Sequence, residues 1–344
     1  MDKDELYMYR CLELAKLAAG NVAPNPMVGA VLVHDEKIIG EGYHQKFGEA
    51  HAEVNCIKSV KEENKHLIEK STLYVSLEPC SHFGKTPPCT DLIIKNKIPK
   101  VVIGCRDVYK EVDRKGIKKL EHSGVEVITG VLEKECNELN KRFFTFHEKQ
   151  RPYIILKWAE SANEKIGIDA GRVLISNEYT NRLVHKWRSE EAAILVGRKT
   201  ALKDDPSLTT RLYPGNNPIR CVTDNDLTLP PWLTLFDRST ATIVFNLLKE
   251  AEEKNIKWVE LKDGDTSTLV TSMYNQDIQS VIVEGGATLL QSFINADLWD
   301  EARIIRNEQL TIEKGINSPG LKNARLQQQE KYFNDTISYF LPLS

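Results

Sequence analysis

Short apolar runs alternate with segments of helical periodicity along the whole chain, and this alternation constrains the fold more than any other feature of the sequence. In the first half, apolar runs of strand length are separated by stretches whose apolar residues recur every three or four positions. An order of strand, helix, strand, helix is typical of right-handed βαβ units around a largely parallel sheet. We expect strands at residues 28–33, 38–43, 72–77 and 100–105, and helices at residues 6–18, 52–60, 89–96 and 133–144.

A second block with the same alternation follows a polar run at residues 147–151. A chain of 344 residues, at roughly 150 residues per domain, also favours two domains. We therefore predict one α/β domain at residues 1–147 and a second at residues 148–344. The second domain has expected strands at 153–158, 192–196, 219–223, 242–246 and 280–284, and expected helices at 177–188 and 287–296.

Composition and charge argue against several classes of protein. Lysine and arginine number 46 against 49 aspartate and glutamate, so the net charge of -3 gives no overall basic field for nucleic acid. The apolar runs are far shorter than the roughly 18 residues that span a membrane. Residues 2–5 are charged and lead into no apolar segment, and the seven cysteines are an odd number scattered along the chain. We predict a cytoplasmic protein of a reducing compartment, with neither a nucleic-acid nor a membrane partner.

The first half contains one imidazole and two thiols in a pattern that suits a catalytic metal ion. His51 opens an expected helix, Cys80 follows an expected strand, and Cys89 precedes the next helix. A catalytic zinc ion takes three such nitrogen and sulfur ligands and keeps its fourth tetrahedral position for water, whose pKa it lowers toward neutrality. The pattern predicts Zn2+ bound by His51, Cys80 and Cys89.

Glu53, two residues after His51, is the expected acid and base of this site. In the middle of a helix, that spacing points two side chains roughly 200° apart, so both reach one pocket only from the first turn. Gly48 and Glu49, just upstream, fit a loop that enters a helix there. Cys89 follows two prolines and is expected at a helix N-terminus, where the helix dipole favours the thiolate.

Other interpretations of these residues stay open. Each cysteine taken alone is more often a small buried apolar residue than a ligand, and a His-x-Glu pair also occurs by chance. A structural zinc site with four protein ligands is a further alternative, with His82 as the fourth ligand. The order of these residues on successive elements favours the catalytic site.

The same segments resemble those of the zinc-dependent cytidine and nucleobase deaminase family. In that family the two cysteines are usually two residues apart, whereas eight residues separate Cys80 from Cys89. This longer spacing resembles the deaminase half of the bifunctional enzymes of riboflavin biosynthesis. The segments that carry the resemblance are 24–29 (Pro-Asn-Pro-Met-Val-Gly), 40–44, 51–54, 78–82 (Glu-Pro-Cys-Ser-His) and 84–89 (Gly-Lys-Thr-Pro-Pro-Cys).

The resemblance implies hydrolytic loss of the ring amino group of 2,5-diamino-6-(5-phosphoribosylamino)pyrimidin-4-one. It places zinc on His51, Cys80 and Cys89, and it makes Glu53 the group that moves protons. It also implies a pyrimidine contact at Asn25, although an Asn-Pro sequence is common in turns. Lys85 could contact the substrate phosphate or could be a solvated loop lysine.

The residues of the second half give weaker signals. Glu284 ends an expected strand, and Gly285 and Gly286 join it to a helix, whose N-terminus attracts phosphate. An ordinary left-handed turn is the alternative, and no Gly-x-Gly-x-x-Gly follows a strand. Arg188 and Arg211 belong to a basic group that would suit a monophosphate, whereas a solvated helix face is the simpler interpretation.

Three segments of the second half resemble the reductase half of the same bifunctional enzymes: 195–200 (Leu-Val-Gly-Arg-Lys-Thr), 204–211 and 283–287. The resemblance implies a fold similar to dihydrofolate reductase, NADPH as the cofactor, and hydride delivery to the sugar C1′ that converts ribosyl to ribityl. The residues that it places at NADPH are Ala159, Thr200, Asp204, Gly285 and Gly286. Those that it places at the substrate are Arg188, Leu208, Arg211 and Glu284.

The sequence departs from the reductase pattern at two places. Residues 161–165 are Ser-Ala-Asn-Glu-Lys, where the family usually has Ser-Leu-Asp-Gly-Lys, so Asn163 and Glu164 replace an aspartate and a glycine. Leu174 stands where an aromatic residue commonly precedes Ile-Thr. Both departures concern the expected nicotinamide pocket.

We therefore predict a bifunctional enzyme with an N-terminal cytidine-deaminase-like αβα domain and a C-terminal dihydrofolate-reductase-like α/β domain. We expect it to bind zinc and NADPH, to act on a phosphorylated pyrimidine riboside, and to form a homo-oligomer. One alternative is a zinc deaminase of another nucleotide or base with a non-catalytic second domain. The other is a zinc-stabilised, nucleotide-binding protein without turnover.

Overall fold

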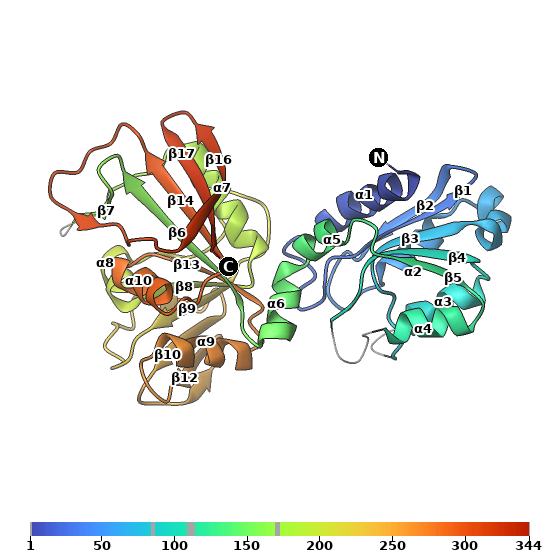
Figure 1. Cartoon of the computed structure of the whole chain (residues 1–344). Helices are drawn as coiled ribbons and strands as arrows, with labels where there is room; N and C mark the ends of the chain where they lie inside the picture. Colours follow the sequence, from blue (N-terminus) through green and yellow to red (C-terminus); the bar gives the residue numbers. More distant parts are fainter. Residues whose placement is uncertain (1, 84–86, 109–113, 169–172, 344) are drawn as a thin grey trace. The chain divides into compact units, whose positions relative to one another are not determined.

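The structure, a computed structural model of the chain, describes residues 2–83, 87–108, 114–168 and 173–343. The chain divides into two compact units, Met1–Lys149 and Gln150–Ser344, which are visible in Figure 1. The boundary placed between residues 147 and 148 from the sequence lies two residues before this division.

The first unit contains a five-stranded mixed sheet. The β1 strand pairs antiparallel with β2 and β3, whereas β3, β4 and β5 run parallel. The predicted alternation of strands and helices accounts for the parallel β3, β4 and β5. The turn at Asp35 and Glu36, which both adopt positive φ, closes β1 and β2 into a hairpin and makes β1 antiparallel to β2. Across the sheet the order is β2 (Lys37–Tyr43), β1 (Gly29–His34), β3 (Thr72–Leu77), β4 (Lys100–Cys105) and β5 (Glu126–Thr129).

Alternate residues of these strands fill two apolar cores, one on each face of the sheet. Ala30 and Leu32 of β1 pack on one face with α2 (Ala52–Ser59), α3 (Cys89–Lys95) and α4 (Lys115–His122). Val31 and Val33 pack on the other face with α1 (Lys3–Lys16), α5 (Glu133–Leu139) and α6 (Lys141–Lys149). The unit is thus a three-layer αβα structure, as predicted. A 3-10 helix, η1 (Glu62–Lys70), connects α2 to β3.

The helix expected at residues 133–144 is two helices, α5 and α6, which meet at Asn140. The Asn140 side chain pairs with both backbone groups of Met27: Met27 N donates to Oδ1 (2.8 Å), and Nδ2 donates to Met27 O (2.9 Å). These two bonds fix the segment around Met27 against the helix break. The segment therefore has a defined position although it belongs to no helix or strand.

The second unit is built on a ten-stranded sheet. Its seven central strands, from β12 to β14, run parallel, and antiparallel strands complete both edges. The order is β11 (Ala251–Glu253), β12 (Ile256–Glu260), β10 (Thr242–Asn246), β9 (Ile219–Thr223), β8 (Ala193–Gly197), β13 (Ser280–Glu284), β6 (Tyr153–Ser161), β14 (Glu301–Asn307), β17 (Asp335–Pro342) and β16 (Ala324–Tyr332).

Helices cover both faces of this sheet. The α7 helix (Glu178–Glu190) and the α8 helix (Arg198–Asp204) pack on one core, and α9 (Thr266–Asn275) and α10 (Ala287–Asn295) pack on the other. The remaining elements are η2 (Thr234–Phe236) and the small β7–β15 pair (Lys165–Gly167 and Ile316–Asn317). Because β8, β13 and β6 are adjacent and parallel, their carboxyl ends meet at one edge, where α/β sheets commonly bind ligands.

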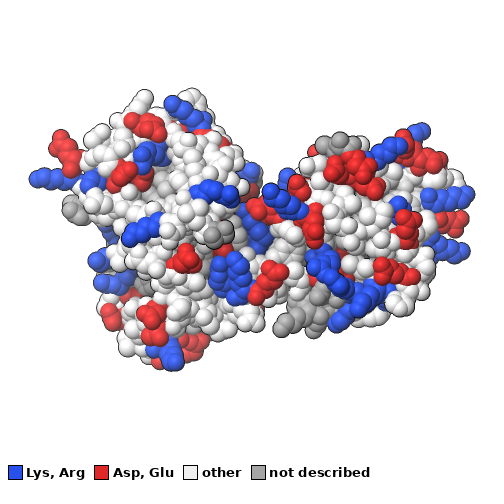
Figure 2. Space-filling view, viewed as in Figure 1, with Lys and Arg blue, Asp and Glu red and all other residues white. Residues whose placement is uncertain are grey.

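The surface in Figure 2 carries basic and acidic side chains intermixed on each unit. Within the described part of the chain, no helix is long and apolar enough to cross a membrane.

Gly29 provides a test of the packing of α1 on the first sheet. A Cβ atom at this position would lie 2.0 Å from Cys11 O, a backbone atom of α1. We expect Gly29→Ala to lower the free energy of unfolding of the first unit by about 1–3 kcal/mol or more, because the helix must move away from the sheet. Chemical denaturation measures this, with Gly167→Ala as the control because nothing lies within 4 Å of its Cβ position. Equal stability of the two variants would contradict this packing.

Candidate functional site

The three predicted metal ligands come together in the first unit. His51 is the N-cap residue of α2, Cys80 lies in the loop after β3, and Cys89 is the first residue of α3. His51 Nδ1 lies 3.6 Å from Cys80 Sγ and 3.3 Å from Cys89 Sγ. The ligand atoms of all three residues lie within 4.8 Å of one another. The sheet and the two helix starts thus converge on one point.

These distances are those of a tetrahedral zinc site. With Zn–S of about 2.3 Å and Zn–N of about 2.0 Å, the S–N edge of a tetrahedron is about 3.5 Å. The two S–N distances in the structure lie on either side of this value. A set of two sulfurs and one imidazole also binds zinc in preference to hard cations, which prefer oxygen ligands. The residues present therefore fit zinc.

The alternative of a four-ligand structural site depends on His82. Among the described residues, the ligand group consists of His51, Cys80 and Cys89, and His82 is not a member of it. His82 instead lines the cavity of about 390 Å3 onto which His51, Cys80 and Glu53 also open. A substrate-sized cavity therefore opens onto two of the three candidate ligands and onto Glu53, which favours a catalytic site.

Glu53 lies in the first turn of α2, as its spacing from His51 requires. Its side chain is buried, with the residue only 3% exposed, and it lines the same cavity. Burial raises the pKa of Glu53, the charge of Cys80 adds to this, and His51 opposes it. A carboxyl group with a raised pKa can both accept and donate a proton near neutral pH, which suits general acid–base catalysis.

The two candidate cysteine ligands are hydrogen-bonded to each other. A hydrogen bond from Cys89 lowers the pKa of Cys80 to about 4, with burial opposing and His51 assisting, whereas the same bond and burial raise the pKa of Cys89. The backbone N of Cys89 also donates to Cys80 Sγ (3.3 Å). Since a metal ion binds both sulfurs as thiolates, metal binding requires that Cys89 lose its proton.

Asn25 lines the cavity next to a histidine that the sequence analysis did not assign. His44 Nδ1 lies 3.0 Å from Ala50 O and so carries a proton, which leaves Nε2 to accept from Asn25 Nδ2 at 3.1 Å. Burial lowers the pKa of His44 and favours this neutral form. The bonds from Ala50 to His44 to Asn25 fix the orientation of the Asn25 amide.

Glu78 is a second buried carboxyl group of this site, and sequence reasoning missed its role. It precedes Pro79 and Cys80, and its oxygens accept from four backbone N–H groups. The donors are Gly116 N (3.1 Å) and Ile117 N (3.3 Å) to Oε1, and Arg114 N (3.2 Å) and Asp107 N (3.4 Å) to Oε2. Glu78 thus holds the start of α4 and the backbone of Asp107, which also lines the cavity, against the Cys80 loop. A glutamate two residues before a candidate ligand was the signal for it.

Lys85, a possible phosphate contact, lies outside the described residues.

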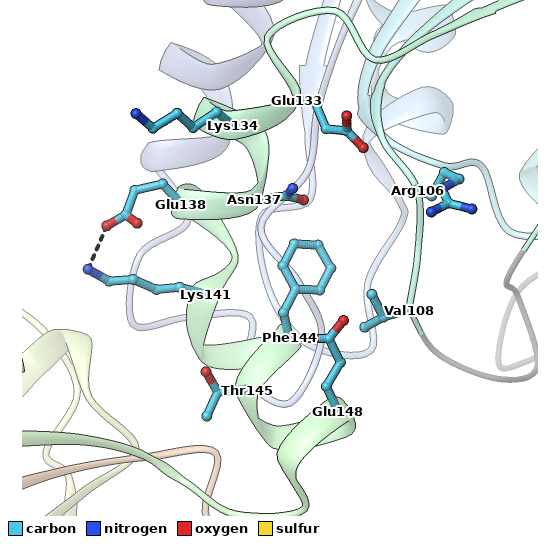
Figure 3. Close-up of a pocket in the computed structure, with 10 residues that line it drawn as sticks. All are labelled: Arg106, Val108, Glu133, Lys134, Asn137, Glu138, Lys141, Phe144, Thr145 and Glu148. Carbon is cyan, nitrogen blue, oxygen red and sulfur yellow. Dashed lines mark hydrogen bonds and ion pairs between the residues drawn. The ribbon is translucent and has the colours of Figure 1, made fainter. Parts of the chain in front are cut away.

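Another hollow, of about 640 Å3, lies beside α5 and α6 and shares no residue with the zinc cavity. Figure 3 shows Phe144 facing Val108, while Lys134, Glu138 and Lys141 point to the other side of the helices. The charged residues that line this hollow are of both signs, and we assign the hollow no role.

In the second unit, Glu284 forms a charged cluster with two cations at the carboxyl ends of β13 and β6. Arg188 Nε and Nη2 donate to the two Glu284 oxygens at 2.8 and 2.7 Å, and Lys157 Nζ lies 3.6 Å from Oε2. Burial acts to raise the pKa of Glu284, but Arg188 and Lys157 lower it to about 2. Burial also lowers the pKa of Lys157, against the effect of Glu284. Sequence reasoning missed Lys157, whose signal was a lysine within an otherwise apolar strand.

The predicted substrate residues Leu208 and Arg211 lie in one segment beside this cluster. Leu208 is buried and has a positive φ of 51°, which is unusual for a branched side chain. Arg188 Nη1 donates to Thr209 O (3.4 Å), and Arg211 Nη1 donates to Thr209 Oγ1 (3.2 Å). The structure therefore brings Arg188, Glu284 and this segment together, with Arg188 engaged by Glu284 rather than lying on a solvated face.

The predicted NADPH residues form a second group. Gly285 and Gly286 have φ of 89° and 82°, and a Cβ on either would lie 3.1 Å from Thr200. The two glycines directly precede α10. Side chains at these positions would fill the space beside Thr200, so the glycines and Thr200 form an open cradle at the start of this helix. Asp204 lies one turn after Thr200 on α8, and Ala159 is on the same face of β6 as Lys157.

The structure explains two of the residues that depart from the reductase pattern, Asn163 and Glu164. Asn163 Oδ1 accepts from Ile312 N (3.1 Å), and its Nδ2 donates to Ile312 O (2.9 Å), so Asn163 ties the β6–β7 turn to a distant segment. Glu164 takes the positive φ of that turn, 58°, and pairs with Arg306 (3.0 Å). Leu174 is 77% exposed, and nothing in the structure explains this substitution.

Comparison with known proteins assigns each unit to a family. Residues 1–105 match the cytidine and deoxycytidylate deaminase zinc-binding region, and residues 152–307 match the RibD C-terminal domain. Both matches agree with the fold classes predicted from the sequence.

Relatives match along most of the chain. The riboflavin biosynthesis protein RibD of Aquifex aeolicus is 37% identical over 98% of each chain, and that of Escherichia coli is 34% identical over 87% of this chain and 86% of its own. A crystal structure from Thermotoga maritima, described as a diaminohydroxyphosphoribosylaminopyrimidine deaminase/5-amino-6-(5-phosphoribosylamino)uracil reductase, is 36% identical. It covers 99% of each chain with a TM-score of 0.90.

The contacts of Glu78 lead to a prediction about metal affinity. Glu78→Gln keeps the size of the side chain but places an amide NH2 against backbone N–H groups, which loosens the Cys80 loop. We expect the affinity for zinc to fall roughly 10- to 100-fold, measured by competition with a chelator. Glu126→Gln, at an exposed ion pair with Lys100, is the control. Equal zinc affinity in both variants would show that the Glu78 carboxylate does not support the site.

Proposed function

The chain belongs to the RibD family, whose members combine a deaminase and a reductase of riboflavin biosynthesis, and on this premise we propose which residues perform the two reactions. The deaminase substrate is 2,5-diamino-6-(5-phosphoribosylamino)pyrimidin-4-one. The product, 5-amino-6-(5-phosphoribosylamino)uracil, is the substrate of the reductase. The observation that carries the proposal is the group of His51, Cys80 and Cys89 beside the buried Glu53.

In the deaminase, His51, Cys80 and Cys89 would hold zinc. When bound, zinc lowers the pKa of a water molecule in its open coordination position. Glu53 accepts one proton from the attacking water and passes it to the adjacent ring nitrogen. It then takes the second proton from the oxygen now bonded to the ring carbon and delivers it to the amino group, which leaves as ammonia. The C–N bond to the amino group breaks, and a carbonyl C–O bond replaces it.

Asn25 would orient the pyrimidine in this reaction. Its amide is already fixed by His44, so little side-chain entropy is lost when it binds the ring. The cavity of about 390 Å3 that Asn25 lines is within the usual range for a small-molecule site.

In the reductase, NADPH would lie against Ala159, Thr200, Asp204 and the loop of Gly285 and Gly286. NADPH, when bound, supplies a hydride for the sugar C1′. Glu284, Arg188, Leu208 and Arg211 would form the substrate side of the site, with Arg211 toward the phosphate.

Reduction of the sugar breaks the bond between C1′ and the ring oxygen, and that oxygen must receive a proton. Lys157 is buried beside Glu284 on the face of the sheet that α7 covers, and burial lowers its pKa toward the working range of a proton donor. We therefore assign Lys157 this role. Glu284 stays ionised because its pKa is about 2, and it keeps Lys157 charged and in place.

The chain's location and assembly are further parts of the proposal. Free cysteines throughout the described chain are consistent with the predicted cytoplasmic, reducing environment. Homo-oligomer formation stays a prediction from the sequence.

Glu53→Gln tests the deaminase assignment. The variant removes the proton carrier and leaves the three metal ligands, so we expect ammonia release to fall at least about 100-fold with zinc content unchanged. Its NADPH oxidation with the deaminated product should equal that of the wild type, which is the internal control. Ammonia release at the wild-type rate would remove Glu53 from the mechanism.

Lys157→Met tests the reductase assignment. Loss of the proton donor should lower kcat for NADPH oxidation by about 100-fold or more, while ammonia release by the same chain is unaffected. Lys186→Met on α7 is the matched control, because the Lys186 side chain is 44% exposed and its Nζ lies 3.9 Å from Glu190 Oε1. If both variants oxidise NADPH equally fast, Lys157 does not donate the proton.

A further inference from the structure

His185 is a buried histidine of α7 that the two proposed reactions do not use. It lies three residues before Arg188 on the same face of the helix and is 2% exposed. Its ring therefore points toward the region where Arg188 meets Glu284. A buried imidazole needs a hydrogen-bond partner, and this partner shows which segment of the chain His185 positions.

That partner is the backbone of the proposed substrate segment. Arg211 N donates to His185 Nδ1 at 3.0 Å, so this nitrogen carries no proton. Burial and the charges of Arg188 and Arg211 lower the pKa of His185 to about 4, although Glu284 and a backbone hydrogen bond with Thr209 oppose this. At neutral pH the ring therefore remains an acceptor for Arg211.

Several hydrogen bonds hold the segment around Arg211. Thr210 N donates to Asn217 Oδ1 (2.8 Å) on one side, and Thr209 O accepts from Arg188 on the other. Leu208, at the start, is buried but has the left-handed φ that disfavours a branched residue. The His185 bond ties the backbone of Arg211 to α7.

We propose that His185 is a positioning residue of the reductase: its Nδ1 fixes the backbone of Arg211 and so sets where the Arg211 guanidinium meets the phosphate of the substrate. This inference rests on the proposed reductase function. A neutral acceptor is the group that this position requires. A carboxylate would compete with Glu284 for Arg188, and a lysine would repel both arginines.

Three variants of the full-length chain separate positioning from simple packing. Asn can place Oδ1 near the position of Nδ1 and keep the bond, Gln places its amide farther along the side chain, and Phe fills the space with no acceptor. We expect His185→Gln and His185→Phe to raise the KM for 5-amino-6-(5-phosphoribosylamino)uracil about tenfold, with kcat nearly unchanged. His185→Asn should keep a KM close to that of the wild type.

The controls use the same protein. The dissociation constant for NADPH, measured by protein fluorescence, should be the same in all variants that fold, and ammonia release should be unaffected. If His185→Phe does not fold, the Asn and Gln pair still decides the question. A wild-type KM in both the Gln and Phe variants, or an equal loss of kcat in all three, would overturn the positioning role. Absence of NADPH oxidation in the wild type would instead overturn the reductase function, and this inference with it.

Discussion

The deaminase site depends on one geometric constraint: a helix start, a strand end and a second helix start must meet within the coordination sphere of one ion. His51 Nδ1 lies 3.3 and 3.6 Å from the two candidate sulfurs, so a small shift of any element would separate them. Glu78 holds the loop after β3 by four backbone hydrogen bonds, and Gly116 lets α4 approach Pro79 so closely that a Cβ would lie 2.1 Å from its carbonyl oxygen. Scaffold residues thus fix the ligands before metal binds.

The two units use buried carboxylates in opposite ways. Burial and the charge of Cys80 raise the pKa of Glu53, which prepares it to carry a proton. Arg188 and Lys157 hold the pKa of Glu284 at about 2 despite burial, so Glu284 remains a fixed anion. In the first unit the charge of Cys80 adds to the effect of burial, whereas in the second unit two cations oppose it. These neighbours support the proposal that a carboxyl group carries the proton in the first unit and a lysine in the second.

The sequence predicted those features that depend on local pattern. Strands 72–77 and 100–105 have the predicted bounds, and His51 and Glu53 lie at the first turn of α2, as their spacing required. It did not predict what depends on distant partners: the helix break at Asn140, which pairs with Met27, or the antiparallel β1. Lys157 and His185 were missed for the same reason, because only the fold brings them to Glu284 and Arg211. The tail after residue 310 carried no motif, yet it forms the β16–β17 edge of the second sheet.

X-ray absorption at the zinc edge, on the protein loaded with one equivalent of zinc, tests the central claim most directly. The account predicts two sulfurs at about 2.3 Å, one imidazole nitrogen at about 2.0 Å and one oxygen from water in the remaining position. A second imidazole in the coordination sphere, as ligation by His82 would give, or a site with fewer than two sulfurs, would contradict it.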